Sequence, residues 1–229
     1  SARNVRSTER DPLLAFARAS AGTPFAPLAG KLAGAVRDMA KGNRVSANWT
    51  LNVGEQLSEL SLSDFRLTSV SGARVAMAPG AALSADLGTG AFAMLGGLSM
   101  SGGGLPTAAL TLQKPQRDKG IAGQLFIEPY AAGGARIDAD TIRFVAAPGG
   151  VTRFDTVLRL DGPLPDAQLR GLQLPLSGRY DEGSGRWAVN ERCVSVRFTQ
   201  LKYSSLALDA TRTNLCPVGG AMVAGGPRG

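Results

Sequence analysis

The chain has 229 residues, of which 44% are hydrophobic but only 6% aromatic, and it contains 30 glycines and 13 prolines. This composition is typical of one large all-β domain with many short strands and tight turns, and it argues against disorder over most of the length. The net charge of +7 favours anionic partners, but the charges are spread singly along the chain, so we expect solvated strand faces and no nucleic-acid partner.

The chain shows neither a membrane anchor nor a signal peptide. It lacks the run of about eighteen apolar residues that a spanning helix needs, and no charged segment followed by an apolar one opens it. The abrupt polar start and glycine-rich finish suggest a piece of a longer protein. We divide it into a helical segment (1–44), a β-sheet domain (45–222) and a flexible tail (223–229).

One or two amphipathic helices are predicted in the first segment. Asp11 before Pro12 is an N-cap signal with proline in the first helical position, and this helix ends near Gly22. A second helix begins at Thr23 or Ala26, because Pro24 and Pro27 each fit only a first turn, and Gly42 and Asn43 end it. Its apolar residues recur at spacings of three and four, so we expect it to dock on a sheet: Phe25, Leu28, Leu32, Val36 and Met39.

From Val45 onward the apolar period changes to two, which predicts strands with one apolar and one polar face. Near Asp64 the phase shifts, which predicts a bulge. Turn signals, including Asp161-Gly162-Pro163, separate short strands, and this spacing predicts an antiparallel meander. Strands are expected at 45–53, 60–67, 73–78, 81–87, 91–100, 107–113, 121–128, 135–146, 152–160, 168–176, 186–189, 193–203 and 206–215.

Cys193 and Cys216 are the only two cysteines, and they bracket the last predicted hairpin. They form either a disulfide or two separate buried thiols. A disulfide closing this loop would contribute on the order of 3 kcal/mol. It would also indicate an oxidising compartment such as the periplasm.

Residues for catalysis are scarce. The absence of histidine excludes Ser-His-Asp and Cys-His catalysis and histidine-containing zinc sites, and two cysteines cannot form a thiolate metal cage. Asp138 and Asp140 would lie on one face of a strand, where two carboxylates could serve a glycosidase. A role in solubility at the sheet edge or in turn formation fits them better. We therefore expect no enzyme activity, no catalytic residue, no metal and no cofactor.

The predicted sheet has more apolar surface than its helices can cover. About a dozen strands would present roughly 1,500 Å² of apolar side chain, which would cost tens of kcal/mol if left in water. Net stabilities are only about 5–15 kcal/mol, and one helix about 25 Å long covers only a part. The remainder is covered by curling of the sheet, by other parts of a longer chain or by an apolar ligand.

Together with the family resemblance described next, these considerations predict a mainly β fold: a long, curved antiparallel sheet that forms an apolar groove, with one or two amphipathic helices near its amino-terminal end. The alternative is a closed β-sandwich or barrel with a structural or protein-docking role and no lipid binding. The side chains expected to line the groove wall are Trp49, Leu51, Phe65, Leu67, Phe126, Phe144, Phe154, Leu158, Val196 and Phe198.

Several segments resemble one protein family in the same order along the chain, over roughly residues 20–222. They are AGTPFAPLAGKLAGAVRD, SGARVAMAPG, GGGLPTAALTL, IEPYAAGGARI, GPLPDAQLRGLQLPLSGRY, NERCVSVRF and LDATRTNLCPVGGAM. They are similar to the carboxy-terminal part of the YdbH-like family of α-proteobacteria, which belongs with the AsmA-like, or bridge-like, lipid transport proteins. The family's paired cysteines match Cys193 and Cys216.

The resemblance implies a periplasmic protein, anchored in the inner membrane by a part absent from this chain, that moves phospholipid between the inner and outer membranes. It also implies three kinds of partner: phospholipid or another acyl-chain lipid, the remaining parts of a longer parent chain, and outer-membrane or periplasmic proteins. An older family label, dicarboxylate transport, finds no supporting residues here. Because most of a full member's length is missing, transport by this piece alone is not implied.

Overall fold

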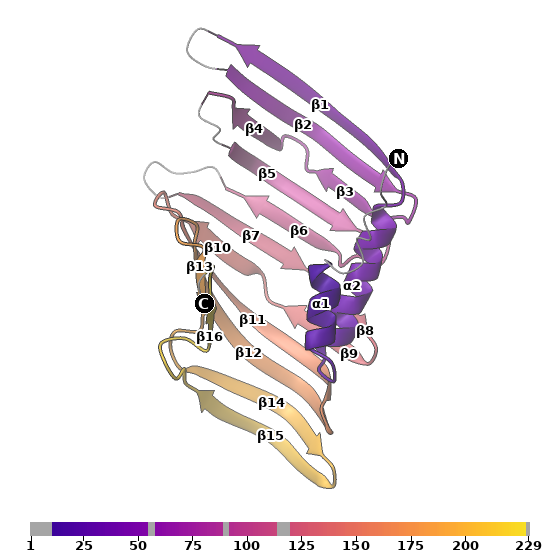
Figure 1. Cartoon of the computed structure of the whole chain (residues 1–229), viewed down its shortest axis with the longest axis vertical. Coiled ribbons are helices and arrows are strands. Elements are labelled where there is room, and N and C mark those ends of the chain that lie inside the picture. Colours follow the sequence, from indigo (N-terminus) through magenta and orange to yellow (C-terminus); the bar gives the residue numbers. More distant parts are fainter. Residues whose placement is uncertain (1–10, 55–57, 89–91, 114–119, 228–229) are drawn as a thin grey trace, which may run out of the picture.

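The computed structural model describes residues 11–54, 58–88, 92–113 and 120–227. These residues form one long antiparallel sheet of 16 strands, and two helices, α1 (Pro12–Ala19) and α2 (Phe25–Met39), lie across the strand ends at one side of it (Figure 1). The predicted fold class, mainly β and antiparallel with helices at the amino-terminal end, is confirmed.

The strands follow the predicted order with small differences at their ends. Their bounds are β1 (Asn43–Val53), β2 (Ser58–Ser69), β3 (Arg74–Met77), β4 (Ala82–Asp86), β5 (Phe92–Ser101), β6 (Ala108–Leu112), β7 (Ile121–Ile127), β8 (Tyr130–Ala132), β9 (Ala135–Ala139), β10 (Ile142–Ala146), β11 (Val151–Leu164), β12 (Ala167–Asp181), β13 (Arg186–Val189), β14 (Val194–Tyr203), β15 (Leu206–Leu215) and β16 (Val223–Gly225).

The sheet is open. Within the described residues β1 pairs only with β2 and β15 only with β14, so these two strands form the far ends of the sheet, at the top and bottom of Figure 1. All strands belong to one sheet, whereas a sandwich needs two sheets packed face to face. The chain therefore does not form the closed β-sandwich that we considered as an alternative.

The strand prediction was wrong at four places. The short strand β8 was not predicted at all. Residues 135–146 form two strands, β9 and β10, because β11 pairs with both, one after the other along the same edge. Asp161-Gly162-Pro163 is not a turn but continues β11, and the register shifts there because two residues of β12, Arg170 and Gly171, oppose Asp161 in a bulge. The expected flexible tail contains β16, which pairs with β13.

Gly162 is required where the chain before α2 comes close to the sheet. Its φ of 149° is one that side-chain-bearing residues rarely adopt. A Cβ at this position would also lie 2.9 Å from the Cβ of Pro24 and 3.0 Å from that of Ala135. The glycine thus lets the start of α2 contact β9 and β11. The glycine that we took as a turn signal is needed for this close contact and not for a turn.

Helix α2 packs along its length against loops and strand ends that are distant in sequence. Leu28 packs with Tyr130 and Ala135 in one buried cluster, and Ala35 packs with Ala73 and Leu105 in a second. Leu32 contacts both clusters and joins them. The predicted docking of the second helix on a sheet is confirmed.

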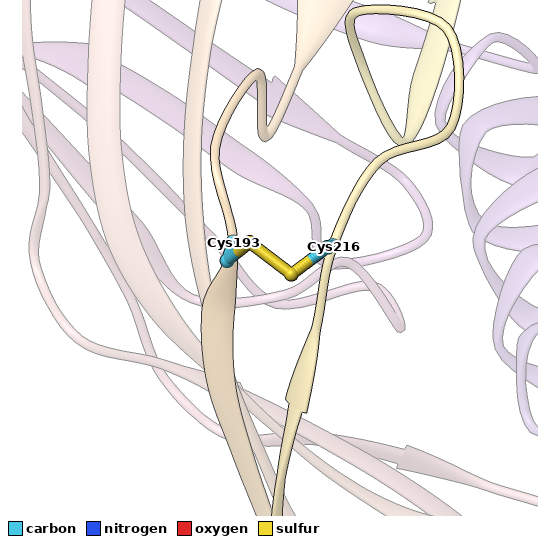
Figure 2. Close-up of a disulfide and its surroundings, with 2 residues drawn as sticks. All are labelled: Cys193 and Cys216. Atoms are coloured by element: carbon cyan, nitrogen blue, oxygen red, sulfur yellow. A yellow bond between two sulfur atoms is a disulfide. The ribbon is translucent and has the colours of Figure 1, made fainter.

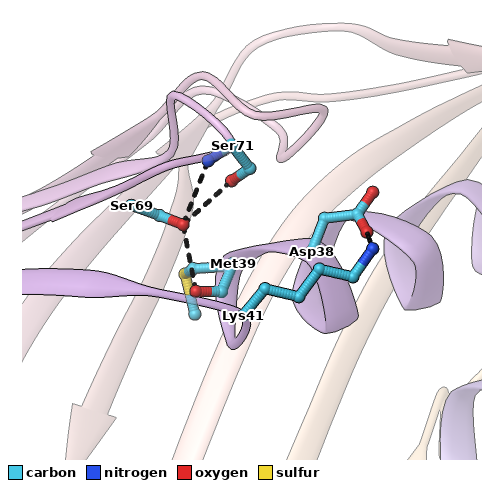
Figure 3. Close-up of polar contacts among 5 residues, drawn as sticks. All are labelled: Asp38, Met39, Lys41, Ser69 and Ser71. Atoms are coloured by element: carbon cyan, nitrogen blue, oxygen red, sulfur yellow. Dashed lines mark hydrogen bonds and ion pairs between the residues drawn. The ribbon is translucent and has the colours of Figure 1, made fainter.

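Hydrogen bonds fix the end of α2 to the turn between β2 and β3 (Figure 3). The Ser69 hydroxyl donates to the Met39 carbonyl at 3.0 Å and lies 3.1 Å from the Gly42 carbonyl, and it accepts from the Ser71 backbone N–H at 3.3 Å. Just beyond the end of the helix, Lys41 Nζ lies 2.6 Å from Oδ1 of Asp38 in its last turn, and this contact lowers the pKa of Asp38.

Cys193 and Cys216 form a disulfide, as one of the two sequence-based alternatives predicted. Cys193 precedes β14 and Cys216 follows β15, so the bond closes the open end of this hairpin (Figure 2). All ten residues of β15 are exposed to solvent. Strand β15 is therefore held by its ladder with β14 and a covalent bond, with little support from a packed core.

The sheet forks next to β12. The first half of this strand pairs with β14 and its last residues pair with β13. Asn190, only 1% exposed, occupies the gap between them: its side chain donates to the Pro175 carbonyl at 3.0 Å and accepts from the Ser177 N–H at 2.8 Å. The backbone N–H of Asn190 also donates to the Ser177 carbonyl at 2.7 Å. Asn190 thus provides hydrogen-bond partners for the backbone groups of β12 that neither β13 nor β14 reaches.

Candidate functional site

The cross-strand register sorts the side chains of the sheet onto two faces, because directly opposed residues point to the same side. In the β1–β2 ladder, Trp49 lies opposite Leu62 and Leu51 opposite Leu60, while Thr50 between them lies opposite a serine. We call the side that carries Trp49 and Leu51 the apolar face and the other side the polar face.

The apolar face continues across the sheet from β1 to β15. Ladder pairs carry it from one strand to the next: Leu67–Val75, Val75–Met100, Leu98–Leu110, Leu110–Leu125, Leu125–Ile142, Phe144–Phe154, Leu158–Leu174 and Val194–Leu215. Every charged strand residue that these ladders assign to a side lies on the polar face, among them Arg66, Arg143, Asp155, Arg159 and Arg197. One face is therefore free of charge along the described strands.

Nine of the ten side chains predicted to line a groove lie on this apolar face: Trp49, Leu51, Phe65, Leu67, Phe144, Phe154, Leu158, Val196 and Phe198. The tenth, Phe126, lies on the polar face, because its neighbours in β7, Leu125 and Ile127, take the apolar side. Val196 is buried, whereas Trp49 is 69% exposed and Leu51 46% exposed. The aromatic residue chosen in β7 was thus on the other side of its strand.

A hollow of about 230 Å³ lies on the apolar face between β7, β9, β10, β11 and β12. Within the described residues no ladder joins β7 to β9, and the hollow lies at this gap. The apolar lining comes from Ile127, Ile137, Ile142, Phe154, Leu158 and Leu176. Glu128 and Asp138 also border the hollow, but the Asp138 carboxylate lies on the polar face beside Arg159. The hollow therefore offers a hydrocarbon surface.

Two phenylalanine rings on the apolar face lie over a glycine of the neighbouring strand. Gly123 is opposite Phe144 and Gly178 is opposite Phe154, and a Cβ added at either glycine would overlap the facing ring. The rings therefore cover the backbone at these glycines with hydrocarbon.

The isoleucines of the hollow were in predicted strands, but we did not name them. Ile127, Ile137 and Ile142 follow the same alternation that identified the strands. Our choice favoured bulky aromatic side chains, whereas this floor is built largely from branched aliphatic ones. Assigning every strand to a face by alternation would have found them.

The acidic pair considered for glycoside hydrolysis is bound to an arginine. Arg159 Nη1 lies 2.7 Å from Asp140 Oδ1 and 3.8 Å from Asp138 Oδ2, and the hydrogen bond to Asp140 raises the pKa of Arg159. Asp138 lies opposite Arg159 on the polar face of the ladder. The two carboxylates therefore neutralise a cation in place of flanking an open cleft.

Comparisons of the chain with protein-family models, curated proteins and solved structures found no match. Neither of the two helices in the described residues is long and apolar enough to cross a membrane. Inferences about function therefore rest on the geometry of the sheet and on the sequence segments described above.

Proposed function

We propose that this chain is part of a periplasmic lipid transport protein, and that its apolar face carries the acyl chains of phospholipids. The observation that supports this most directly is the exposed, charge-free face. Trp49, Leu51 and Val53, at 69%, 46% and 75% exposure, stand in a row on β1, and no other element of the described chain covers them. Exposed apolar surface of this extent is typical of sites that bind apolar partners.

The energetics favour a lipid tail as the occupant. Each methylene group moved from water to an apolar surface gains about 0.8 kcal/mol, so a tail that leaves a membrane pays a large penalty unless such a surface receives it. A continuous apolar face lets the tail move from strand to strand at nearly constant free energy. The head group would remain in water, and no chemical step is involved.

The cellular setting is also part of the proposal. The disulfide between Cys193 and Cys216 favours an oxidising compartment. The resemblance to the YdbH-like family favours a periplasmic location, with an anchor in the inner membrane and further length supplied by the parent chain. Movement of phospholipid between the inner and outer membranes, together with outer-membrane or periplasmic protein partners, is the function that we infer for that parent protein.

The test is photo-crosslinking of a phosphatidylglycerol that carries a diazirine on its acyl chain, with protein purified without detergent. Leu158→Glu places a charge in the hollow and should abolish crosslinking. The matched control is Val157→Glu, the adjacent residue on the polar face opposite Pro175, which should leave crosslinking intact. Trp49→Glu with Thr50→Glu as control repeats the comparison on β1.

Circular dichroism and the presence of the disulfide should show that each variant folds. The proposal fails if Leu158→Glu and Trp49→Glu both crosslink as strongly as the wild type, or if the controls lose as much as the test variants. Native mass spectrometry of the wild-type protein should in addition show lipid adducts that match phospholipid masses.

A further inference from the structure

A second hollow, of about 420 Å³, lies on the polar face, on the opposite side of the sheet from the lipid-binding face proposed above. Four arginines line it: Arg143 of β10, Arg153 of β11, Arg179 of β12 and Arg192 of the loop between β13 and β14. We call it the arginine pocket. Its volume lies within the range of about 300–1,000 Å³ that is typical of small-molecule sites.

The register of the sheet brings like charges together in the arginine pocket. Arg153 lies directly opposite Arg179 in the β11–β12 ladder. Like charges that face each other across a ladder destabilise the sheet. Glu191 neutralises only Arg179, whose Nε lies 3.0 Å from Oε1 and 3.1 Å from Oε2 of that carboxylate. The charge of Arg153 remains without compensation.

Three guanidinium groups of the pocket are free to bind a ligand. Arg143, Arg153 and Arg192 form no hydrogen bond or ion pair with any residue that the structure describes. Asp155 is opposite Arg143 in the ladder, but the two side chains form no ion pair. With four arginines against two carboxylates in the lining, the pocket has a net charge of +2.

We infer that the arginine pocket binds a phosphate group, as a phosphate monoester or a phosphodiester. The planar fork of an arginine donates two parallel hydrogen bonds to a phosphate, and groups from three adjacent strands and a loop converge here on one hollow. The phosphate belongs either to a soluble compound or to a lipid head group. This inference does not depend on the proposed role of the apolar face.

Binding is tested with two probes at constant ionic strength. Isothermal titration calorimetry with glycerol 3-phosphate tests binding of a soluble phosphate compound. Co-sedimentation with phosphatidylcholine vesicles that contain phosphatidylglycerol tests binding of a lipid head group. Arg153→Gln should weaken binding at least tenfold. The matched control is Arg66→Gln, an exposed arginine of β2 on the same face but outside the pocket, which should change the affinity less than twofold.

A gain-of-affinity variant sharpens the test. Glu191→Gln releases Arg179 from its ion pair and should strengthen binding several-fold. Leu158→Glu, on the other face, should leave glycerol 3-phosphate binding unchanged. Binding of glycerol 3-phosphate identifies a soluble ligand, and binding of vesicles alone identifies a head group. Absence of binding to both probes, or equal losses in Arg153→Gln and Arg66→Gln, would overturn the inference.

Discussion

The apolar face has a covered part and an open part, built from similar residues. Under α2, Ala135 of β9 and the adjoining loop residues Ala73 and Leu105 are at most 7% exposed, whereas on β1 Trp49 and Val53 are more than two-thirds exposed. Hydrophobicity therefore does not decide which part is buried. The covered part lies where small residues such as Ala73 let the helix approach, and no helix reaches the open part.

The difference separates stability from binding. Burial of an apolar side chain stabilises the fold in proportion to the area removed from water, so the covered part should contribute most of the packing energy. The open part contributes little to folding and remains available to a ligand. Substitutions that compare the two parts should therefore affect different measurements.

The largest effect is expected from truncation of a side chain by which α2 packs on the covered part. Leu28→Ala removes buried methyl groups that pack with Tyr130 and Ala135, and should lower the free energy of unfolding by about 2–4 kcal/mol. Leu51→Ala, a leucine in the open part, should cost less than about 1 kcal/mol. Urea denaturation measures both, and equal losses would contradict the distinction between the two parts.

The disulfide should stabilise the open carboxy-terminal hairpin by about 3 kcal/mol, because it replaces the packing that exposed β15 lacks. The double variant Cys193→Ser with Cys216→Ser should lose this amount in chemical denaturation. A reducing agent should destabilise the wild type to the same extent and leave the variant unaffected. An unchanged wild type under full reduction would argue against this role.

Asn190 should contribute to the stability of the fold, although it belongs to neither the covered nor the open part of the apolar face. Asn190→Ala leaves the Ser177 N–H and the Pro175 carbonyl unpaired at the fork, and should cost about 1–3 kcal/mol. Asn52→Ala, at an exposed position of β1, serves as the control and should be nearly neutral. Hydrogen exchange at Ser177 should accelerate only in the Asn190 variant.

Trp49→Ser should change the free energy of unfolding by less than about 0.5 kcal/mol, because its side chain is mostly exposed. The same variant should reduce lipid crosslinking severalfold. Stability and crosslinking that fall together would show that the open part is a structural core.

The smallest effect concerns Asp38 at the end of α2. The hydrogen bond and charge of Lys41 lower its pKa below the ordinary 3.8. Lys41→Gln should return the pKa toward that value in a carboxyl-carbon NMR titration, while Asp181, whose pKa is lowered mainly by the Ser184 N–H, should not change. Since the folded-state pKa is the lower one, the contribution to stability is present above the ordinary value and is lost as the pH falls through the folded one.

Much of the fold followed from alternation along the chain. The strands at 186–189 and 206–215 have the predicted limits, and the bulge near Asp64 appears as a register shift in the β1–β2 ladder. The split at Asp140 and the continuation of β11 through Gly162 did not follow, because they depend on pairing with β11 and on the contact of Gly162 with Pro24, which involve distant parts of the chain. Local sequence does not contain such contacts.

The candidate sites were predictable only in part. Alternation places Leu158 and Trp49 on one side of their strands, but the position of α2 over Ala73 and Leu105 depends on packing between distant segments. The arginine pocket likewise depends on which arginines become neighbours across ladders, as Arg153 and Arg179 do. Both features depend on which distant segments become neighbours, and a single sequence specifies this only weakly.

The confinement of charge to one face has a consequence for how the chain folds. A strand that paired one residue out of step would turn its arginines and aspartates into the oily side, which makes such mispaired intermediates unfavourable. A shift of two residues avoids that penalty, but it would misplace the bulges at Asp64 of β2 and Gly171 of β12 against their partner strands. The same segregation that leaves one side fit for hydrocarbon thus also protects a chain of many similar strands from misfolding.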